Sequence, residues 1–104
     1  MNNIFEAIPA DIPSEIFEDL IRNANFRLER IVSHGHASPD NEWYDQDDDE
    51  WVLLIEGSAQ IEFQTDRRIA NLTKGSILNI PAHSKHRVNW TQKENPTIWL
   101  TIHY

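Results

Sequence analysis

The chain contains no cysteine, so it can form neither disulfides nor thiolate–metal bonds, and any bound metal ion would depend on imidazole and oxygen ligands. Its longest uninterrupted apolar run covers only residues 51–55, which is far too short to cross a bilayer. Residues 1–6 lack the basic start and the apolar core of a signal peptide. These absences predict a cytoplasmic protein that has no membrane partner.

Basic residues are also scarce, since 9 Lys and Arg stand against 17 Asp and Glu, giving a net charge of −8. The acidic excess is concentrated in residues 40–50, which contain no Lys or Arg. Nucleic-acid affinity comes mainly from Lys and Arg that displace counterions, so we expect no nucleic-acid partner. We expect the acidic segment to be a solvated loop that, at the rim of a cavity, would repel anions and attract cations.

Helical patterning is limited to residues 11–22 at the N-terminal end of the chain. Apolar side chains recur there at helical spacing, and Ser14 could cap the first turn. The side chains on the expected apolar face are Ile12, Ile16, Phe17, Leu20 and Ile21. The pattern predicts a short N-terminal helix within a segment, residues 1–25, that packs on the main domain.

The remainder of the chain, residues 26–104, has the pattern of short strands. Ala59, Ile61 and Phe63 alternate with polar residues, and similar alternation covers residues 86–91 and 98–103. Turn residues such as Gly57 and Pro81 separate the segments. Many short strands with tight turns predict an all-β sandwich or barrel for residues 26–104.

Residues two apart on a strand point the same way, so the faces of four polar residues can be predicted. If Phe26, Leu28 and Val32 face the core, His34 and His36 face it too. His86 is expected inside with Val88 and Trp90, and Glu50 with Val52 and Leu54, although the apolar Trp51, Leu53 and Ile55 leave the other face of that strand open as the core. A single inward histidine is usually an ordinary core residue. Three histidines and a carboxylate converging on one interior instead predict a site for a divalent Fe, Mn, Ni, Cu or Zn ion.

The order of these residues resembles the motifs of small single-domain cupins over residues 26–104. The first cupin motif is His-x-His, a gap of three or four residues, Glu, six residues and Gly; His34, His36, Glu50 and Gly57 supply its residue types. The second runs from a glycine through Pro-x-Gly to a histidine, matched by Gly75, Pro81 and His86. The resemblance implies a double-stranded β-helix, or jelly-roll barrel, in which His34, His36, Glu50 and His86 bind a metal ion.

Two features depart from the cupin pattern. Thirteen residues separate His36 from Glu50, which predicts that the acidic loop is an insertion and leaves Asp40 as a competing ligand. Glu50 is preferred because Gly57 follows it at the expected spacing. His83 stands where the second motif has glycine, at a turn position that often needs a positive φ. A cupin with such departures could also be free of metal.

Several other side chains are candidates for roles around the cavity. Trp43 and Tyr44 either fasten the acidic loop to the barrel or line a pocket over the metal, and Trp90 would form the cavity floor. Tyr44 and His83 are candidate proton donors. Trp99 and His103 are expected on the outer face, where they suggest the contact of a homodimer.

Three functions follow from these expectations. The first is a metal-dependent enzyme, a dioxygenase or an isomerase, that acts on a small neutral or cationic organic molecule. The second is a binding module that holds a metal or small ligand without turnover. The third is a metal-free cupin scaffold, and the fold alone does not choose among them.

Overall fold

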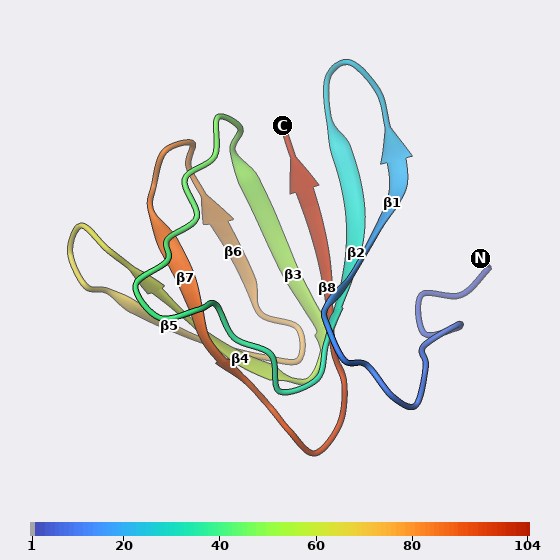
Figure 1. Ribbon diagram of the computed structural model, residues 1–104. Coiled ribbons are helices and arrows are strands. Elements are labelled where there is room, and N and C mark those ends of the chain that lie inside the picture. The colour runs from blue at the N-terminus through green and yellow to red at the C-terminus, as the bar shows by residue number, and fades with distance from the viewer. Residues whose placement is uncertain (1) are drawn as a thin grey trace.

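The computed structural model describes residues 2–104, and within them every regular element is a strand (Figure 1). The eight strands in this range are β1 (Ile16–Arg22), β2 (Arg27–Ser33), β3 (Glu50–Glu56), β4 (Ser58–Phe63), β5 (Ile69–Thr73), β6 (Ile77–Ile80), β7 (His86–Thr91) and β8 (Thr97–His103). They form two antiparallel sheets, one ordered β1-β2-β8-β3-β6 and the other β5-β4-β7. The predicted all-β class is therefore confirmed.

The predicted N-terminal helix is wrong, because residues 16–22 form β1, an edge strand. β1 pairs with β2 from Ile16 opposite Val32 to Arg22 opposite Arg27, with an irregularity between Asp19 and Ile21. This bulge interrupts the period-two pattern of the strand and leaves apolar residues at a spacing that imitates a helix face. Pairing with β2 satisfies the backbone groups that a helix would have satisfied internally.

A fully buried arginine attaches the N-terminal segment to the outer face of the larger sheet. Arg30 lies on β2 with none of its surface exposed, and its Nη1 donates to the carbonyl oxygens of Ile4, at 2.9 Å, and Glu6, at 2.7 Å. Its Nη2 pairs with Glu18 of β1. One guanidinium thus holds β1, β2 and the preceding segment together.

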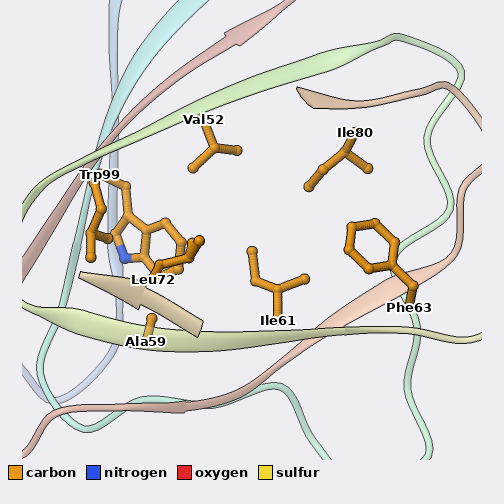
Figure 2. Packing of buried hydrophobic residues seen from close by; sticks show 8 residues of the cluster. Val52, Ala59, Ile61, Phe63, Leu72, Ile80 and Trp99 are labelled. Atoms are coloured by element: carbon orange, nitrogen blue, oxygen red, sulfur yellow. The ribbon is translucent and has the colours of Figure 1, made fainter. Parts of the chain in front are cut away.

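The hydrophobic core lies between the two sheets, and Figure 2 shows side chains from both sheets pointing toward one another. β3 and β8 of the larger sheet contribute Val52, Leu54 and Trp99, and β4 of the smaller sheet contributes Ile61 and Phe63. The remaining members of the cluster are Ala59, Leu72 and Ile80. The alternation predicted for residues 59–63 is confirmed, since Ala59, Ile61 and Phe63 are all buried.

The faces predicted for β2 and β8 are reversed. Glu29 and Ile31 of β2, and Trp99, Thr101 and His103 of β8, line the space between the sheets. On the opposite face Val32 and Ile98, which pair across the strands, are almost completely buried as well. Because both faces of these two strands are covered, apolar residues occur at both parities and do not reveal the inner face. Trp99 and His103 therefore do not form the outer surface that suggested a homodimer.

Gly57 makes the tight connection between β3 and β4. Its φ of 101° is rare for residues with a side chain, and an added Cβ would lie 2.8 Å from the Cα of Thr97. The glycine that the cupin pattern places after Glu50 is thus required both by the backbone conformation and by the close approach of β8.

Candidate functional site

A cavity of about 300 Å³ lies between the two sheets. Its polar side chains gather where β3 and β7 begin and β8 ends, at Glu50, His86 and His103. The full lining consists of Glu15, Phe17, Asp19, Arg27, Glu29, Ile31, Tyr44, Gln46, Glu50, Val52, Ile61, Ile80, His86, Val88, Trp99, Thr101 and His103. A mostly apolar cavity with a few convergent polar groups is typical of small-molecule sites.

Glu50 is the first residue of β3 and faces the cavity, as predicted from its being on the same face of the strand as Val52 and Leu54. Only 8% of its surface is exposed. Burial acts most strongly on its pKa and raises it, but contact with His86, the charges of His103 and His86, and a hydrogen bond from Gln46 together outweigh burial. The pKa of Glu50 is therefore lowered, and its carboxylate is charged at neutral pH.

His86 begins β7 on the opposite sheet and reaches Glu50 across the cavity. Its Nδ1 lies 2.8 Å from the carbonyl oxygen of Ser84, which can only accept, so Nδ1 donates. Its Nε2 lies 3.6 Å from Oε1 of Glu50. The ring of Tyr44 flanks the imidazole at 5.5 Å and that of Phe63 at 6.1 Å between centroids. The Ser84 carbonyl fixes the ring so that Nε2 is the nitrogen available to the cavity.

Tyr44 and Gln46 enter the cavity from the segment between β2 and β3. Tyr44 forms an isolated bridge with His86, in which their backbone N–H and C=O groups exchange bonds at 2.7 and 3.2 Å. Gln46 donates from Nε2 to Oε1 of Glu50 at 3.1 Å, and its carbonyl accepts from the N–H of His83 at 2.8 Å. Burial raises the pKa of Tyr44, and the charge of Glu15 adds to this effect. The Tyr44 phenol therefore keeps its proton at neutral pH.

A second histidine–carboxylate pair, which the sequence analysis missed, lies on the same cavity wall. His103 Nε2 is 3.1 Å from Oε1 of Glu29, and both residues are more than nine-tenths buried. Thr101 donates a longer hydrogen bond of 3.4 Å to the same oxygen. His103 also stands directly opposite Glu50 in the pairing of β8 with β3. The cavity thus holds two His–Glu pairs in neighbouring positions.

The structure does not bring His34 and His36 to this site. They follow Ser33, which pairs with Thr97 at the start of β8, whereas Glu50 pairs with His103 at its end. Seven residues of extended strand place these two ends about 20 Å apart. His34 instead contacts the carbonyl oxygen of Lys93 through Nε2 at 2.9 Å, and its backbone N–H donates to Nδ1 of His36 at 2.8 Å. Figure 1 shows the connecting segment running from one end of the sheets to the other.

The expected four-residue metal site is consequently not assembled. Within residues 2–104 no group of three or more His, Asp or Glu side chains is placed to hold one ion. In the cupin motif a gap of three or four residues separates the second histidine from the glutamate. Applied before Glu50, a gap of three places Gln46 and Tyr44 at the two histidine positions, and both line the cavity. The acidic loop is therefore not an insertion after a His-x-His pair, because the residues at the two histidine positions are Tyr44 and Gln46. This count was the sequence signal that could have found them.

The other predicted residues lie outside the cavity lining. Asp40 has a 99% exposed side chain, 3.9 Å from Arg87, so it does not compete with Glu50. Trp43 contacts the Arg67 guanidinium, 5.9 Å from the ring centroid, and fastens the loop to the β4–β5 turn. Trp90 is 42% exposed because an irregularity in the β4–β7 pairing reverses the direction of the side chains that follow Val88.

His83 occupies the turn after β6 with a φ of 61°, so the positive φ expected where the cupin pattern has glycine is confirmed. Its exposed ring lies 2.8 Å from Asp45 and 3.6 Å from Asp47, facing the acidic loop rather than the cavity. The predicted role of His83 as a proton donor to a bound ligand therefore lacks contact with the cavity. Its backbone instead positions Gln46.

Comparison with known proteins gives matches among solved structures only. No family profile matches the chain, and no curated protein matches it. A crystal structure from Ralstonia eutropha JMP134, of a protein provisionally named a mannose-6-phosphate isomerase, is 43% identical, with a TM-score of 0.94, covering 99% of this chain and 95% of that chain.

More distant structures share the fold. A cupin superfamily protein from Desulfitobacterium hafniense DCB-2 is 20% identical, with a TM-score of 0.75 and coverage of 92% of this chain and 82% of that one. Cobalt(II) HppE, solved with Tris buffer, is 12% identical, with a TM-score of 0.73 and coverage of 94% and 57%. The chain belongs to the same family as the 43% identical protein, and its fold is that of the cupin superfamily.

No element in residues 2–104 is a helix of the length and apolar character that spanning a bilayer would require.

Proposed function

We propose that this cupin binds a small organic molecule between its sheets and transfers a proton on it through His86, as an isomerase does. The observation that carries the proposal is the buried pair of His86 and Glu50, whose Nε2 and Oε1 atoms lie 3.6 Å apart at the cavity wall. Histidine is the commonest general acid–base group, and a neighbouring carboxylate stabilises the imidazolium that forms when it accepts a proton.

The proposed chemistry needs no redox partner. His86 Nε2 would take a proton from a carbon or hydroxyl group of the ligand, because Nδ1 already donates to Ser84. The proton would return to a different atom of the ligand directly from the His86 imidazolium, or from the Tyr44 phenol beside it, which would then take the proton back from the imidazolium. The ligand would be rearranged without gain or loss of atoms, and Gln46 would hold the Glu50 carboxylate in place.

The comparisons support isomerisation over oxygenation. The 43% identical protein from Ralstonia eutropha is provisionally named an isomerase and matches this chain over nearly its whole length. Its named substrate, mannose 6-phosphate, is a separate question, since the charges of the cavity determine which ligand can enter. Binding without turnover is the alternative if no proton transfer occurs.

A metal-dependent function is the second candidate, because Tyr44, Gln46, Glu50 and His86 stand at the positions that the cupin spacing assigns to metal ligands. The residues do not fit such a centre. Only one of the four is an imidazole, and the Gln46 amide donates to Glu50. Transition-metal sites without cysteine rest mainly on imidazole and carboxylate groups. No catalytic step is therefore assigned to a metal.

The test is solvent-proton exchange into a panel of small hydroxyketones, aminoketones and aldoses in D₂O, followed by NMR. We expect His86→Asn to slow exchange by about 100-fold or more, as for loss of a general base. The matched control His34→Asn, at the opposite end of the sheets, should exchange at the wild-type rate. Saturable binding without exchange in the wild type would favour the binding module.

Metal analysis of the purified protein separates the two candidates. We expect far less than one metal ion per chain, and exchange that survives treatment with a chelator. One ion per chain that is lost in His86→Asn but kept in His34→Asn would establish the metal centre and overturn the proton-only proposal.

A further inference from the structure

We propose that the ligand of this cavity is an organic amine, a cation with an apolar body, rather than an organic acid or a sugar phosphate. The proposal rests on the proposed function only in taking the space between the sheets as the binding site. It adds the chemical class of the ligand, which follows from the charges and surfaces of the lining.

The lining is strongly acidic. It contains the carboxylates of Glu15, Asp19, Glu29 and Glu50 but only one guanidinium, that of Arg27. Arg27 forms ion pairs with lining carboxylates, since its Nε lies 3.7 Å from Asp19 and its Nη2 lies 3.9 Å from Glu29, although Nε makes no hydrogen bond within residues 2–104. Among the lining residues, the positive charge that a phosphate or carboxylate group normally depends on is therefore already balanced by carboxylates.

The two innermost carboxylates are well placed to hold a cation. Glu29 and Glu50 are 7% and 8% exposed, and they lie on β2 and β3, the two strands on either side of the central strand β8. A buried carboxylate is costly unless it has charged or hydrogen-bonding partners. His103 and His86 provide part of this compensation. An ammonium group between the carboxylates would add donors and positive charge, whereas an anion would be repelled at short range.

The remaining walls suit a hydrocarbon body. Val52, Ile61, Ile80, Val88 and Trp99 cover the wall from both sheets, and Figure 2 shows four of them facing one another across the core. Hydroxyl groups of a sugar would lose their water there without gaining partners. The volume of about 300 Å³ is at the lower end of the range for small-molecule sites, so the body is small.

The acidic loop extends the same preference beyond the cavity. Tyr44 and Gln46, which reach into the lining, belong to a segment, residues 40–50, that carries seven acidic residues and no basic one. Such a segment raises the local concentration of cations and lowers that of anions. The field of this segment and the charges inside the cavity therefore favour the same class of ligand.

The experiment compares four probes by NMR: 2-phenylethylamine, 2-phenylethanol, 3-phenylpropanoate and mannose 6-phosphate. The indole N–H of Trp99, whose ring lines the cavity, reports binding. We expect 2-phenylethylamine to bind at least about tenfold more tightly than the alcohol, and the two anions to bind more weakly still. Added salt should weaken binding of the amine only.

Matched variants identify the carboxylate that gives the preference for the amine over the alcohol. Glu50→Gln should weaken binding of the amine about tenfold and leave the alcohol unchanged. Glu94→Gln removes the same charge from an exposed position in the β7–β8 loop and should change neither. The wild-type comparison of the four probes needs no variant, so it decides the question even if Glu50→Gln folds poorly.

The outcomes separate the two proposals. If the alcohol, 3-phenylpropanoate or mannose 6-phosphate binds the cavity as tightly as the amine, the ligand class is wrong while the cavity remains the site. If none of the four probes shifts the Trp99 resonance at millimolar concentration, this inference is overturned, while the proposed function is still decided by the exchange test. Amine binding that is unchanged in both Glu50→Gln and Glu29→Gln also contradicts the inference.

Discussion

At the scale of single residues, two glycines with positive φ differ in what surrounds them. At Gly57 an added Cβ would meet the backbone of Thr97, whereas at Gly75 nothing lies within 4 Å of such an atom. Substitution of either glycine by alanine would strain the backbone, but only Gly57→Ala would also force β8 away from the β3–β4 turn.

We therefore expect Gly75→Ala to lower the free energy of unfolding by about 1–2 kcal/mol through its φ alone. Gly57→Ala should cost about 1–3 kcal/mol more, because the close contact with Thr97 adds to the strain. Urea unfolding of the two variants measures the difference. Equal losses would show that the contact with Thr97 relaxes freely.

Strand parity placed some side chains of the site and misplaced others. Alternation identified His86, whereas Glu50 needed its spacing to Gly57 as well, because both faces of β3 are apolar. His34 and His36 were misplaced because the strand ends at Ser33, after which parity no longer applies. Tyr44 could have been found from its spacing to Glu50.

At the scale of elements, β1 and the segment before it depend on one guanidinium. Arg30 is fully buried and satisfies two carbonyl oxygens and the carboxylate of Glu18 at once. Its removal would leave these partly buried acceptors without their donor, and an unsatisfied buried group costs more free energy than the average hydrogen bond contributes.

Arg30→Met should lower the free energy of unfolding by about 2 kcal/mol or more and speed hydrogen exchange in residues 2–22 before the rest of the chain. The control is Arg22→Met, since Arg22 is exposed and its ion pair with Asp19 lies on the surface. Uniform exchange in Arg30→Met would contradict the local role of the guanidinium.

The inward face of a strand was predictable where only one face is buried, and it was not predictable where both faces are buried. The pattern of β4 alternates cleanly, so its side chains were assigned correctly. β2 and β8 are covered on both faces, and the pairing that joins Glu29 to His103 connects residues far apart in the chain. No local pattern contains that information. In β1 the local pattern was misleading, because the bulge spaced the apolar residues as in a helix.

At the scale of the whole molecule, Glu50 connects the two sheets and makes stability depend on pH. Its pKa is lower in the folded protein, despite burial, because His86, His103 and Gln46 favour the charged form. The unfolded chain has a glutamate pKa of about 4.3 and therefore binds the proton more readily. The stabilisation from Glu50 is complete above that pH and is lost as the pH falls through the lower folded value.

We expect the stability advantage of the wild type over Glu50→Gln to be greatest at pH 6–7 and to shrink steadily toward pH 3. Urea unfolding across this range gives the difference, in which other carboxylates largely cancel. Glu94→Gln should differ from the wild type by a small amount at every pH. An advantage that grows on acidification would mean that Glu50 is protonated in the folded state.

The attachment of Arg30 to the carbonyl groups of Ile4 and Glu6 gives the first few residues an unexpected importance. Trimming the protein to begin at residue 8 would remove no part of the cavity or the core cluster. It would, however, remove the residues that normally cover the charge of Arg30. The opening residues cover Arg30, and shortening them should loosen the pairing of β1 with β2 before it affects any ligand.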